Sequence, residues 1–272
     1  MKKVNKMGER YIDSLSNPLI KKVVKYQQKS SERKKDGLFV IEGVREVSLA
    51  CQSGVEIISL FICDDYYSDN KEYPINKEKA KELISVSAAA YNKMAYRAGT
   101  EGTLAIARQF DTSLERLQLS PMPLLVVIES LEKPGNLGAI LRTADAAGVD
   151  GLIICDQHTD IFNPNAIRSG LGCIFSVKVA VSSREEYFKW SLQQGISTMI
   201  ASVQATMPYY DASYTKPVAL AFGTEANGLS PHWYEFSGEH LKIPMAGRID
   251  SLNVSVSAAI LIFEAVRQRR KM

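Results

Sequence analysis

Apolar and polar positions alternate along the chain in blocks that predict two successive series of strands and helices. Short apolar runs predict strands, and stretches with apolar residues three or four positions apart predict helices. The first series predicts helix 17–36, strand 38–41, helix 43–52, strand 57–63, helix 77–83 and strand 103–108. Strands that alternate with helices are typical of a small α/β domain.

The first predicted helix has a clear start and two different sides. Asn17 is a favourable N-cap, and Pro18 suits the first turn of a helix. Leu19, Val23 and Tyr26 recur at helical spacing, so we expect their side of the helix to face the core. The opposite side is basic.

A polar stretch with prolines, QFDTSLERLQLSP at 109–121, separates the two series. We therefore expect a domain at 1–110, a linker at 111–121 and a second domain at 122–272. The second series predicts strands 124–129, 151–155, 176–181, 197–203, 218–222 and 242–244, with helices 137–147, 165–170, 185–194 and 252–270. Single helices between strands favour a mainly parallel sheet that is covered on both faces.

Positive charge is concentrated at the amino terminus. Residues 1–35 hold eleven Lys and Arg against three Asp and Glu, so their charge is 11 − 3 = +8, whereas the whole chain carries +3. A positive segment of this kind attracts polyanions, most often nucleic acid, although a solvated basic face is the alternative. The expected RNA-binding residues are Lys21, Lys22, Lys25, Arg33, Lys34 and Lys35. Four cations at 267–271 form a second cluster, which also suits a helix carboxyl terminus.

Composition excludes several classes of protein. Hydrophobic residues make up 46% of the chain and charged residues 23%, which is typical of a globular protein. No apolar stretch is long enough for a signal peptide or a membrane span, so we expect a cytoplasmic protein without membrane contact. No CxxC pair occurs, and no cysteine or histidine has metal-ligand spacing, so neither a disulfide framework nor a metal site is expected. A metal-dependent hydrolase is disfavoured for the same reason.

The first segment with candidate chemistry is ESLEKPGNLGAILR at 129–142. Pro134 and Gly135 suit a turn between strand and helix, and Asn136 can cap the helix. Arg142 lies on a largely apolar helix, where a guanidinium is unfavourable unless it is paired or faces a cleft. The segment has no GxGxxG fingerprint, which argues against a nucleotide-dependent oxidoreductase.

The second segment is LAFGTEANGLS at 220–230, where a buried strand stops at Gly223 and is followed by Glu225 and Gly228 in a loop. Glycines at the carboxyl end of a strand let a ligand approach the backbone closely, and open α/β sheets bind their ligands at this edge.

The third segment, IPMAGRIDSLNVSVSAA at 243–259, runs through a loop into the last helix. Ser251 is a plausible cap for this helix. Apolar residues recur at helical spacing after it, and we expect them in the core: Val256, Ala259, Ile260, Phe263 and Val266.

In this order, the three segments resemble the SpoU/TrmH family of RNA 2′-O-ribose methyltransferases, within the SPOUT superfamily. The matching patterns are N-x-G-x(3)-R from Asn136 to Arg142, F-G-x-E-x-x-G-L at 222–229, I-P-M at 243–245 and S-L-N-V-S-V at 251–256. The basic domain before them, with FVIEG at 39–43, resembles the substrate-binding domain of many family members, which has the fold of small RNA-binding ribosomal proteins.

The resemblance implies an α/β methyltransferase domain with a deep carboxyl-terminal trefoil knot and S-adenosylmethionine as cofactor. It implies a homodimer formed through that domain, and an RNA substrate. The separate amino-terminal domain favours large-subunit rRNA over tRNA. The positions that match cofactor-binding residues are Gly223, Gly228, Ile243, Met245, Ser251 and Leu252. The positions that match catalytic and substrate-positioning residues are Asn136, Arg142, Glu225 and Asn253.

Methyl transfer to a ribose hydroxyl needs in-line positioning and removal of a proton, but no metal. A guanidinium stays protonated at physiological pH, so we expect Arg142 to stabilise the forming alkoxide, while Glu225 and Asn136 orient it. An RNA phosphate or water is then the proton acceptor. Two alternatives remain, a tRNA 2′-O-methyltransferase and a non-catalytic RNA-binding or ribosome-assembly protein. The latter does not require Asn136, Arg142, Glu225 and Asn253 together.

Overall fold

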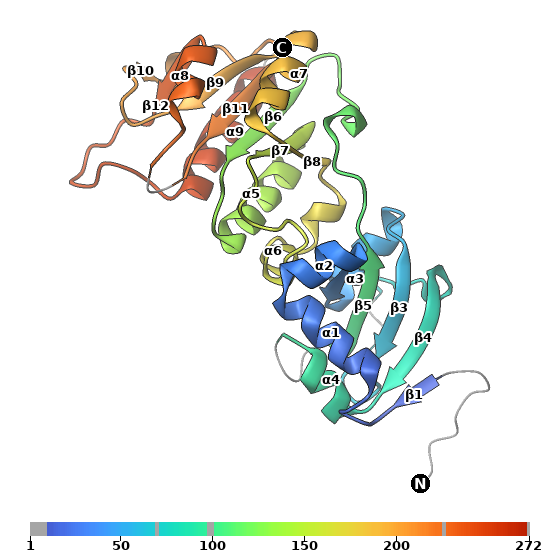
Figure 1. Cartoon of the computed structure of the whole chain (residues 1–272). Coiled ribbons are helices and arrows are strands. Elements are labelled where there is room, and N and C mark those ends of the chain that lie inside the picture. Colours follow the sequence, from blue (N-terminus) through green and yellow to red (C-terminus); the bar gives the residue numbers. More distant parts are fainter. Residues whose placement is uncertain (1–9, 69–70, 97–100, 225–226, 271–272) are drawn as a thin grey trace. The chain divides into compact units, whose positions relative to one another are not determined.

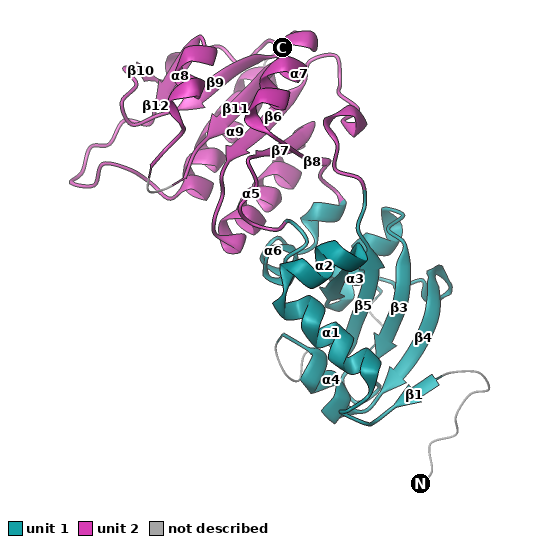
Figure 2. Cartoon of the chain, viewed as in Figure 1, with its two compact units in different colours: residues 1–110, 161–175 teal, residues 111–160, 176–272 magenta. Residues whose placement is uncertain are grey.

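A computed structural model describes residues 10–68, 71–96, 101–224 and 227–270, which fall into two compact units. Unit 1 comprises the chain up to Phe110 together with Ile161–Phe175, and unit 2 comprises Asp111–Asp160 and the chain from Ser176 onward (Figure 2). The expected boundary near residue 110 therefore coincides with a boundary between the units. The segment 161–175, which we expected in the second domain, groups with unit 1 instead.

Unit 1 is built on a mixed sheet (Figure 1). In sheet order, its strands are β1 (Arg10–Ile12), β4 (Ala80–Val86), β3 (Ile57–Ile62), β5 (Thr103–Arg108) and β2 (Leu38–Glu42). The first three run parallel, whereas β5 is antiparallel to β3 and to β2. Its helices are α1 (Pro18–Gln28), α2 (Ser30–Asp36), α3 (Val44–Gln52), α4 (Ala88–Met94) and α6 (Pro164–Ser169).

The start of α1 agrees with the sequence prediction. The Asn17 side chain accepts a hydrogen bond from the backbone N–H of Leu19 over 2.9 Å, and Pro18 begins the helix. Ile20, Val23 and Tyr26 are the buried residues of α1. The prediction of a single helix over 17–36 is wrong. Lys29 adopts an extended backbone conformation and divides this segment into α1 and α2.

The helix predicted at 77–83 is also wrong. Only Lys77–Lys79 form one short 3₁₀ turn, and Ala80–Val86 form β4. This strand lies between β1 and β3 and pairs with both, so its backbone is satisfied by neighbours distant in sequence. Pairing of this kind overrides the local helix propensity of a Lys- and Glu-rich segment.

Aromatic packing joins the segment 161–175 to the rest of unit 1. The ring of Phe39 in β2 lies 4.8 Å from that of Phe162 and 6.2 Å from that of Phe175, measured between centroids. The helix predicted near 165–170 is present as α6, which packs on β2. This burial of apolar rings explains why a segment flanked on both sides by unit 2 belongs to unit 1.

Unit 2 contains a sheet whose pairings are all parallel in the described part of the chain. In sheet order, its strands are β10 (Met207–Pro208), β12 (Glu239–Lys242), β9 (Ser197–Ala201), β11 (Val218–Phe222), β6 (Leu124–Glu129), β7 (Gly151–Cys155) and β8 (Val179–Ser182). Its helices are α5 (Pro134–Ala147), α7 (Arg184–Gln193), α8 (Pro231–Phe236) and α9 (Val254–Arg269). The prediction of a mainly parallel sheet is confirmed.

Both faces of this sheet are covered. On one face, alternate residues of β6, β7 and β11 pack with Tyr187, Trp190 and Trp233 from α7 and α8. On the other face, α9 contacts β6 and β11, and α5 contacts β7 and α9 (Figure 1). Every residue of β6, β7 and β11 is buried, as continuous apolar strands require.

Two predicted caps in unit 2 are replaced by other residues. Helix α5 begins at Pro134 after Lys133, so Asn136 lies inside its first turn and does not cap it. Helix α9 is capped by Asn253, whose side chain accepts from the N–H of Ser255, and not by Ser251.

The core side of α9 also differs from the prediction. Its buried residues are Val254, Ala258, Leu261, Ile262 and Ala265. Val256 and Phe263 are 47% and 46% exposed, so the predicted apolar stripe does not lie in the core of unit 2. Helix α9 has apolar residues on more than one side, and periodicity alone does not say which side the sheet covers.

The basic carboxyl-terminal cluster is partly structural. The Arg269 guanidinium donates to the carbonyls of Tyr214, Lys216, Met122 and Pro123. It therefore ties the end of α9 to two segments of unit 2. In the described residues, no helix is long and apolar enough to cross a membrane.

Candidate active site

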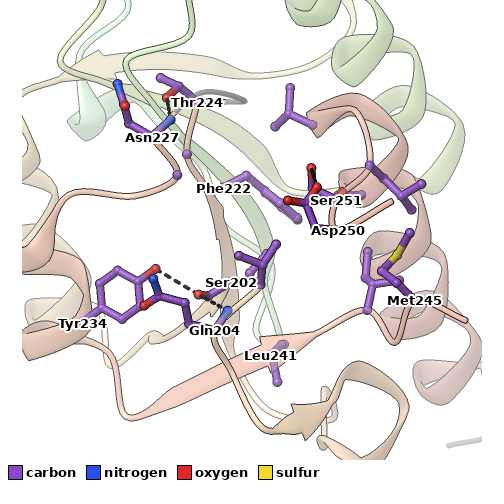
Figure 3. A pocket seen from close by; sticks show the side chains of 18 residues that line it. Ser202, Gln204, Phe222, Thr224, Asn227, Tyr234, Leu241, Met245, Asp250 and Ser251 are labelled. Carbon is purple, nitrogen blue, oxygen red and sulfur yellow. Dashed lines mark hydrogen bonds between the residues drawn. The ribbon is translucent and has the colours of Figure 1, made fainter. Parts of the chain in front are cut away.

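A cavity of about 360 Å³ lies at the carboxyl ends of β9, β11 and β12, where the first turn of α9 forms a further wall (Figure 3). Its volume lies within the range of small-molecule sites. Ligands of open α/β sheets bind at the carboxyl ends of the strands.

The six positions that the sequence assigns to a cofactor all line this cavity. They come from two loops, one after β11 and one between β12 and α9, and they are Gly223, Gly228, Ile243, Met245, Ser251 and Leu252. The loops meet because each follows the carboxyl end of a parallel strand.

Glycine is required where the chain crosses itself at the cavity wall. Thr224 and Gly228 exchange two backbone hydrogen bonds, of 3.1 and 3.0 Å. A Cβ atom on Gly223 would lie 2.0 Å from the carbonyl carbon of Gly228, and Gly228 has a φ of +66°. Both positions exclude ordinary side chains, so the backbone itself forms this wall.

The cavity has apolar walls and polar groups at separate places. Phe222, Leu241 and Met245 supply apolar surface, while the hydroxyls of Ser202 and Tyr234 are hydrogen-bonded to each other over 2.9 Å (Figure 3). Asp250 is the charged residue of the described lining, which contains no Lys or Arg. These groups suit a nucleoside with a positive centre better than a phosphate ester, because a phosphate favours cationic donors.

Ser202, Gln204 and Tyr234 line the cavity, although sequence analysis did not select them. Ser202 and Gln204 follow the carboxyl end of β9, so the rule that identified Gly223 applies to them as well. Tyr234 lies on the short helix α8, which was not predicted.

Two of the four predicted catalytic residues, Asn136 and Asn253, are hydrogen-bonded to each other, and neither lines the cavity. Asn253 donates from Nδ2 to Oδ1 of Asn136 over 3.3 Å, and this bond joins the first turns of α5 and α9. Arg142 is exposed, does not line the cavity, and makes no hydrogen bond or ion pair with another described residue. Glu225 lies outside the described residues.

The predicted RNA-binding cations differ in accessibility. Lys21, Lys25, Lys34 and Lys35 are exposed, whereas the exposed ammonium of Lys22 lies 3.3 Å from the carboxylate of Asp36. The assignment of Arg33 to RNA binding is wrong, because this residue is 2% exposed and donates to the carbonyl of Tyr26. A buried guanidinium that satisfies a helix-terminal carbonyl has a structural role.

Metal-ligand chemistry has no candidate in the described chain. No group of three or more His, Cys, Asp and Glu residues there could hold a metal ion. All four cysteines are free thiols in buried positions.

Comparison with known proteins gives two family matches that cover both units. Residues 123–263 match the SpoU rRNA Methylase family, and residues 17–105 match the MRM3-like substrate binding domain. The 23S rRNA (uridine(2479)-2′-O)-methyltransferase of Streptomyces viridochromogenes is 30% identical over 254 residues, covering 88% of this chain and 86% of the relative. The 23S rRNA (guanosine(2553)-2′-O)-methyltransferase RlmP of Bacillus subtilis is also 30% identical, covering 93% of this chain and 98% of the relative.

Solved structures show the same similarity. An AdoMet-bound rRNA methyltransferase from Sinorhizobium meliloti superposes with a TM-score of 0.86 at 27% identity, covering 95% of this chain and 97% of that one. The SpoU methyltransferase AviRb from S. viridochromogenes, in complex with AdoMet, gives a TM-score of 0.85 at 26% identity, covering 93% of this chain and 98% of that one.

Proposed function

Because the chain belongs to the SpoU rRNA methylase family, we propose that it transfers a methyl group from S-adenosylmethionine to a ribose 2′-hydroxyl of large-subunit ribosomal RNA. The observation that carries the assignment is the convergence of the six expected cofactor residues on one cavity. Relatives that span nearly the whole chain are named as 23S rRNA 2′-O-methyltransferases, which favours rRNA over tRNA as the substrate. An rRNA substrate in turn favours a cytoplasmic site of action.

The residues of the cavity fit S-adenosylmethionine, which supplies an electrophilic methyl group on a sulfonium centre. Gly223 and Gly228 give the cofactor access to backbone N–H and C=O groups. Apolar side chains such as Phe222 and Met245 can cover a flat base, and the carboxylate of Asp250 is the charged group of the described lining that could attract a positive centre.

Arg142 has the chemistry of an electrostatic stabiliser. Its guanidinium stays protonated at physiological pH, so it can stabilise an alkoxide as negative charge develops on the ribose oxygen. The linked pair of Asn136 and Asn253 would position the ribose near this charge. Glu225 would orient the arginine, and an RNA phosphate or water would accept the proton.

We propose further that the protein is a homodimer through unit 2, with each site completed near the partner. Two observations support this arrangement. Val256 and Phe263 leave an apolar stripe of α9 exposed, and Arg142 does not line the cavity of its own chain. Apolar side chains gain free energy when a second copy covers them.

The family's deep trefoil knot belongs to the same proposal. After β12, which lies between β10 and β9, the chain returns to α9, which packs on α5, β6 and β11. A return path of this kind is what threading through a loop requires. Mechanical extension of unit 2 from its two ends tests the knot, because a tightened knot makes the unfolded chain shorter than its full contour length.

The proposed function is tested by two measurements. Titration calorimetry in EDTA should detect binding of S-adenosylhomocysteine to the full chain. Mapping of 2′-O-methyl groups on rRNA and tRNA, from cells with and without the gene, should show one rRNA site lost. Loss of a tRNA site instead would show that the substrate is tRNA. Binding of S-adenosylhomocysteine without the loss of any 2′-O-methyl group would favour a non-catalytic RNA-binding protein.

A further inference from the structure

A buried carboxylate lies at the carboxyl end of β6, beside the start of the loop that walls the cavity. Glu129 is 5% exposed and follows Ile128, the partner of Phe222 in the sheet, so it lies next to Gly223 in register. Its Oε2 accepts from the backbone N–H of Ser230 over 2.7 Å, and its Oε1 accepts from the Ser230 hydroxyl over 2.6 Å. Glu129 therefore accepts two hydrogen bonds from Ser230, one from its backbone and one from its side chain.

Arg184, the first residue of α7, completes this group. Its Nη1 donates to the Ser230 hydroxyl over 3.0 Å and lies 3.5 Å from Oε1 of Glu129. Its backbone N–H lies 3.3 Å from a carboxylate oxygen of Asp156, directly after β7. The three side chains of Glu129, Arg184 and Ser230 therefore form a network that joins β6, α7 and the start of α8, and Nη2 of Arg184 extends it to the exposed carboxylate of Glu185.

Ser230 uses its hydroxyl in an unusual way for its position. It is the N-cap residue of α8 and has the extended backbone of an N-cap, with φ −65° and ψ 157°, yet its side chain makes no capping bond. Ser183, the N-cap of α7, does use its hydroxyl to accept from the N–H of Glu186. The Ser230 hydroxyl therefore serves Glu129 and Arg184 in place of the helix.

Stability alone does not account for this network. Removing two charges from water costs about as much as their attraction returns, so a buried ion pair adds little net stability compared with apolar packing. The Nε of Arg184 is also buried without a partner in the described part of the chain, which adds a further cost. A buried polar network of this kind holds its residues in one geometry. Here that geometry determines where the adjoining loop lies, at the wall of the cavity.

Ser230 ends the loop that begins at Gly223. Two residues before it, Gly228 is tied to Thr224 by the paired backbone bonds, and Leu229 between them is 5% exposed. The loop is thus held at both ends, by β11 at Gly223 and by Glu129 at Ser230. Loss of the second anchor would leave Ser230 held only through α8, which follows it directly and packs into the core with Trp233.

Building on the proposed function, we propose that Glu129 and Arg184 are positioning residues for methyl transfer, which hold Ser230 and thereby fix the cavity wall at Gly228 against the cofactor. Neither residue lines the cofactor cavity, so both act through Ser230.

A pair of identical substitutions separates positioning from stability. Ser230→Ala removes the anchoring hydroxyl without removing a cap, whereas Ser183→Ala removes the true cap of α7. We expect Ser183→Ala to unfold at a lower temperature but to bind S-adenosylhomocysteine like the wild type. Ser230→Ala should raise the dissociation constant about tenfold, because small misplacements of a binding wall are costly. Ser230→Thr, which keeps the hydroxyl, should restore most of the affinity.

Two further readouts keep the test decisive. If Glu129 acts through Ser230, the double variant Glu129→Gln/Ser230→Ala should bind no more weakly than the worse single variant. Hydrogen exchange at the amides of Thr224 and Gly228 should quicken in Ser230→Ala and not in Ser183→Ala. Equal affinity and equal exchange in the two alanine variants would overturn the inference. Absence of binding in the wild type would refute the proposed function instead, while the exchange rates would still decide the anchoring.

Discussion

The amide of Asn253 donates to Oδ1 of Asn136 over 3.3 Å, joining two helices through residues 117 positions apart. The Oδ1 atom of the same Asn253 accepts from the N–H of Ser255 over 2.9 Å and so caps α9. One side chain therefore sets both the start of α9 and the environment of Asn136 in α5.

Substitutions at Asn253 should separate these two roles. Asn253→Ser keeps a capping oxygen but removes the amide, whereas Asn253→Ala removes both. We expect Asn253→Ala to lower the free energy of unfolding by about 1 kcal/mol and Asn253→Ser to lower it much less. Both should reduce the single-turnover methylation rate. Urea unfolding and single-turnover assays measure the two effects, and a wild-type rate in Asn253→Ser would remove the amide from the mechanism.

Arg142→Ala should leave the fold intact and reduce turnover by orders of magnitude. The residue is exposed and has no partner among the described residues, so the change in unfolding free energy should stay within about 0.5 kcal/mol. Its charge matters most as the oxyanion forms, so cofactor affinity should stay near normal. Arg142→Lys should recover part of the rate, because lysine keeps the charge without the planar fork. Near-normal turnover in Arg142→Ala would leave Glu225 and Asn253 as candidates.

Phe263→Glu should convert a homodimer into monomers. Phe263 is 46% exposed on the apolar stripe of α9, where a carboxylate would oppose burial by a second copy. Light scattering should give twice the chain mass of 30.1 kDa for the wild type and one chain mass for the variant. Leu192→Glu on α7 is the control, because Leu192 is 68% exposed and lies outside the stripe. A monomeric wild type at micromolar concentration would refute the dimer.

Reversal of charge at Lys21 and Lys25 should weaken RNA binding without changing cofactor affinity. Both residues are exposed and lie one turn apart on α1. A double Lys→Glu variant should reduce the slope of binding affinity against salt concentration, because fewer counterions are released. Lys189→Glu on α7 provides a single charge reversal in unit 2, to be compared with Lys21→Glu alone as well as with the double variant. If the double variant and this control bind RNA equally well, α1 is a solvated basic face.

Unit 1 should lose stability as pH rises toward neutrality, because of Glu46. Burial raises the pKa of this carboxyl to about 7, and the nearby Glu101 adds to the effect. The folded state therefore binds a proton more tightly than the unfolded state, so this contribution is complete below about pH 4.5 and is lost as pH rises through about 7. Glu46→Gln should flatten the dependence of unfolding free energy on pH across that window. An unchanged pH profile would show that Glu46 titrates normally.

Local sequence signals were reliable where local physics decides the outcome. The cap at Asn17 and the buried strands of unit 2 depend on neighbouring residues or on continuous apolar runs. The cavity residues were predicted from the resemblance of three segments to the SpoU/TrmH family, and they lie together because loops after parallel strands meet at one edge of the sheet. The network of Glu129, Arg184 and Ser230 had no signal of this kind, since each residue looks ordinary in its own segment.

The sequence by itself determined the two α/β series, the parallel character of the second sheet and the loops that gather at its edge. Only the tertiary structure decided that Arg33 is internal, that 77–83 contains a strand and that Phe263 lies outside the core of unit 2. It also decided that 161–175 packs with unit 1. The physical reason is that periodicity defines a face or a strand, whereas burial depends on which distant segment covers it.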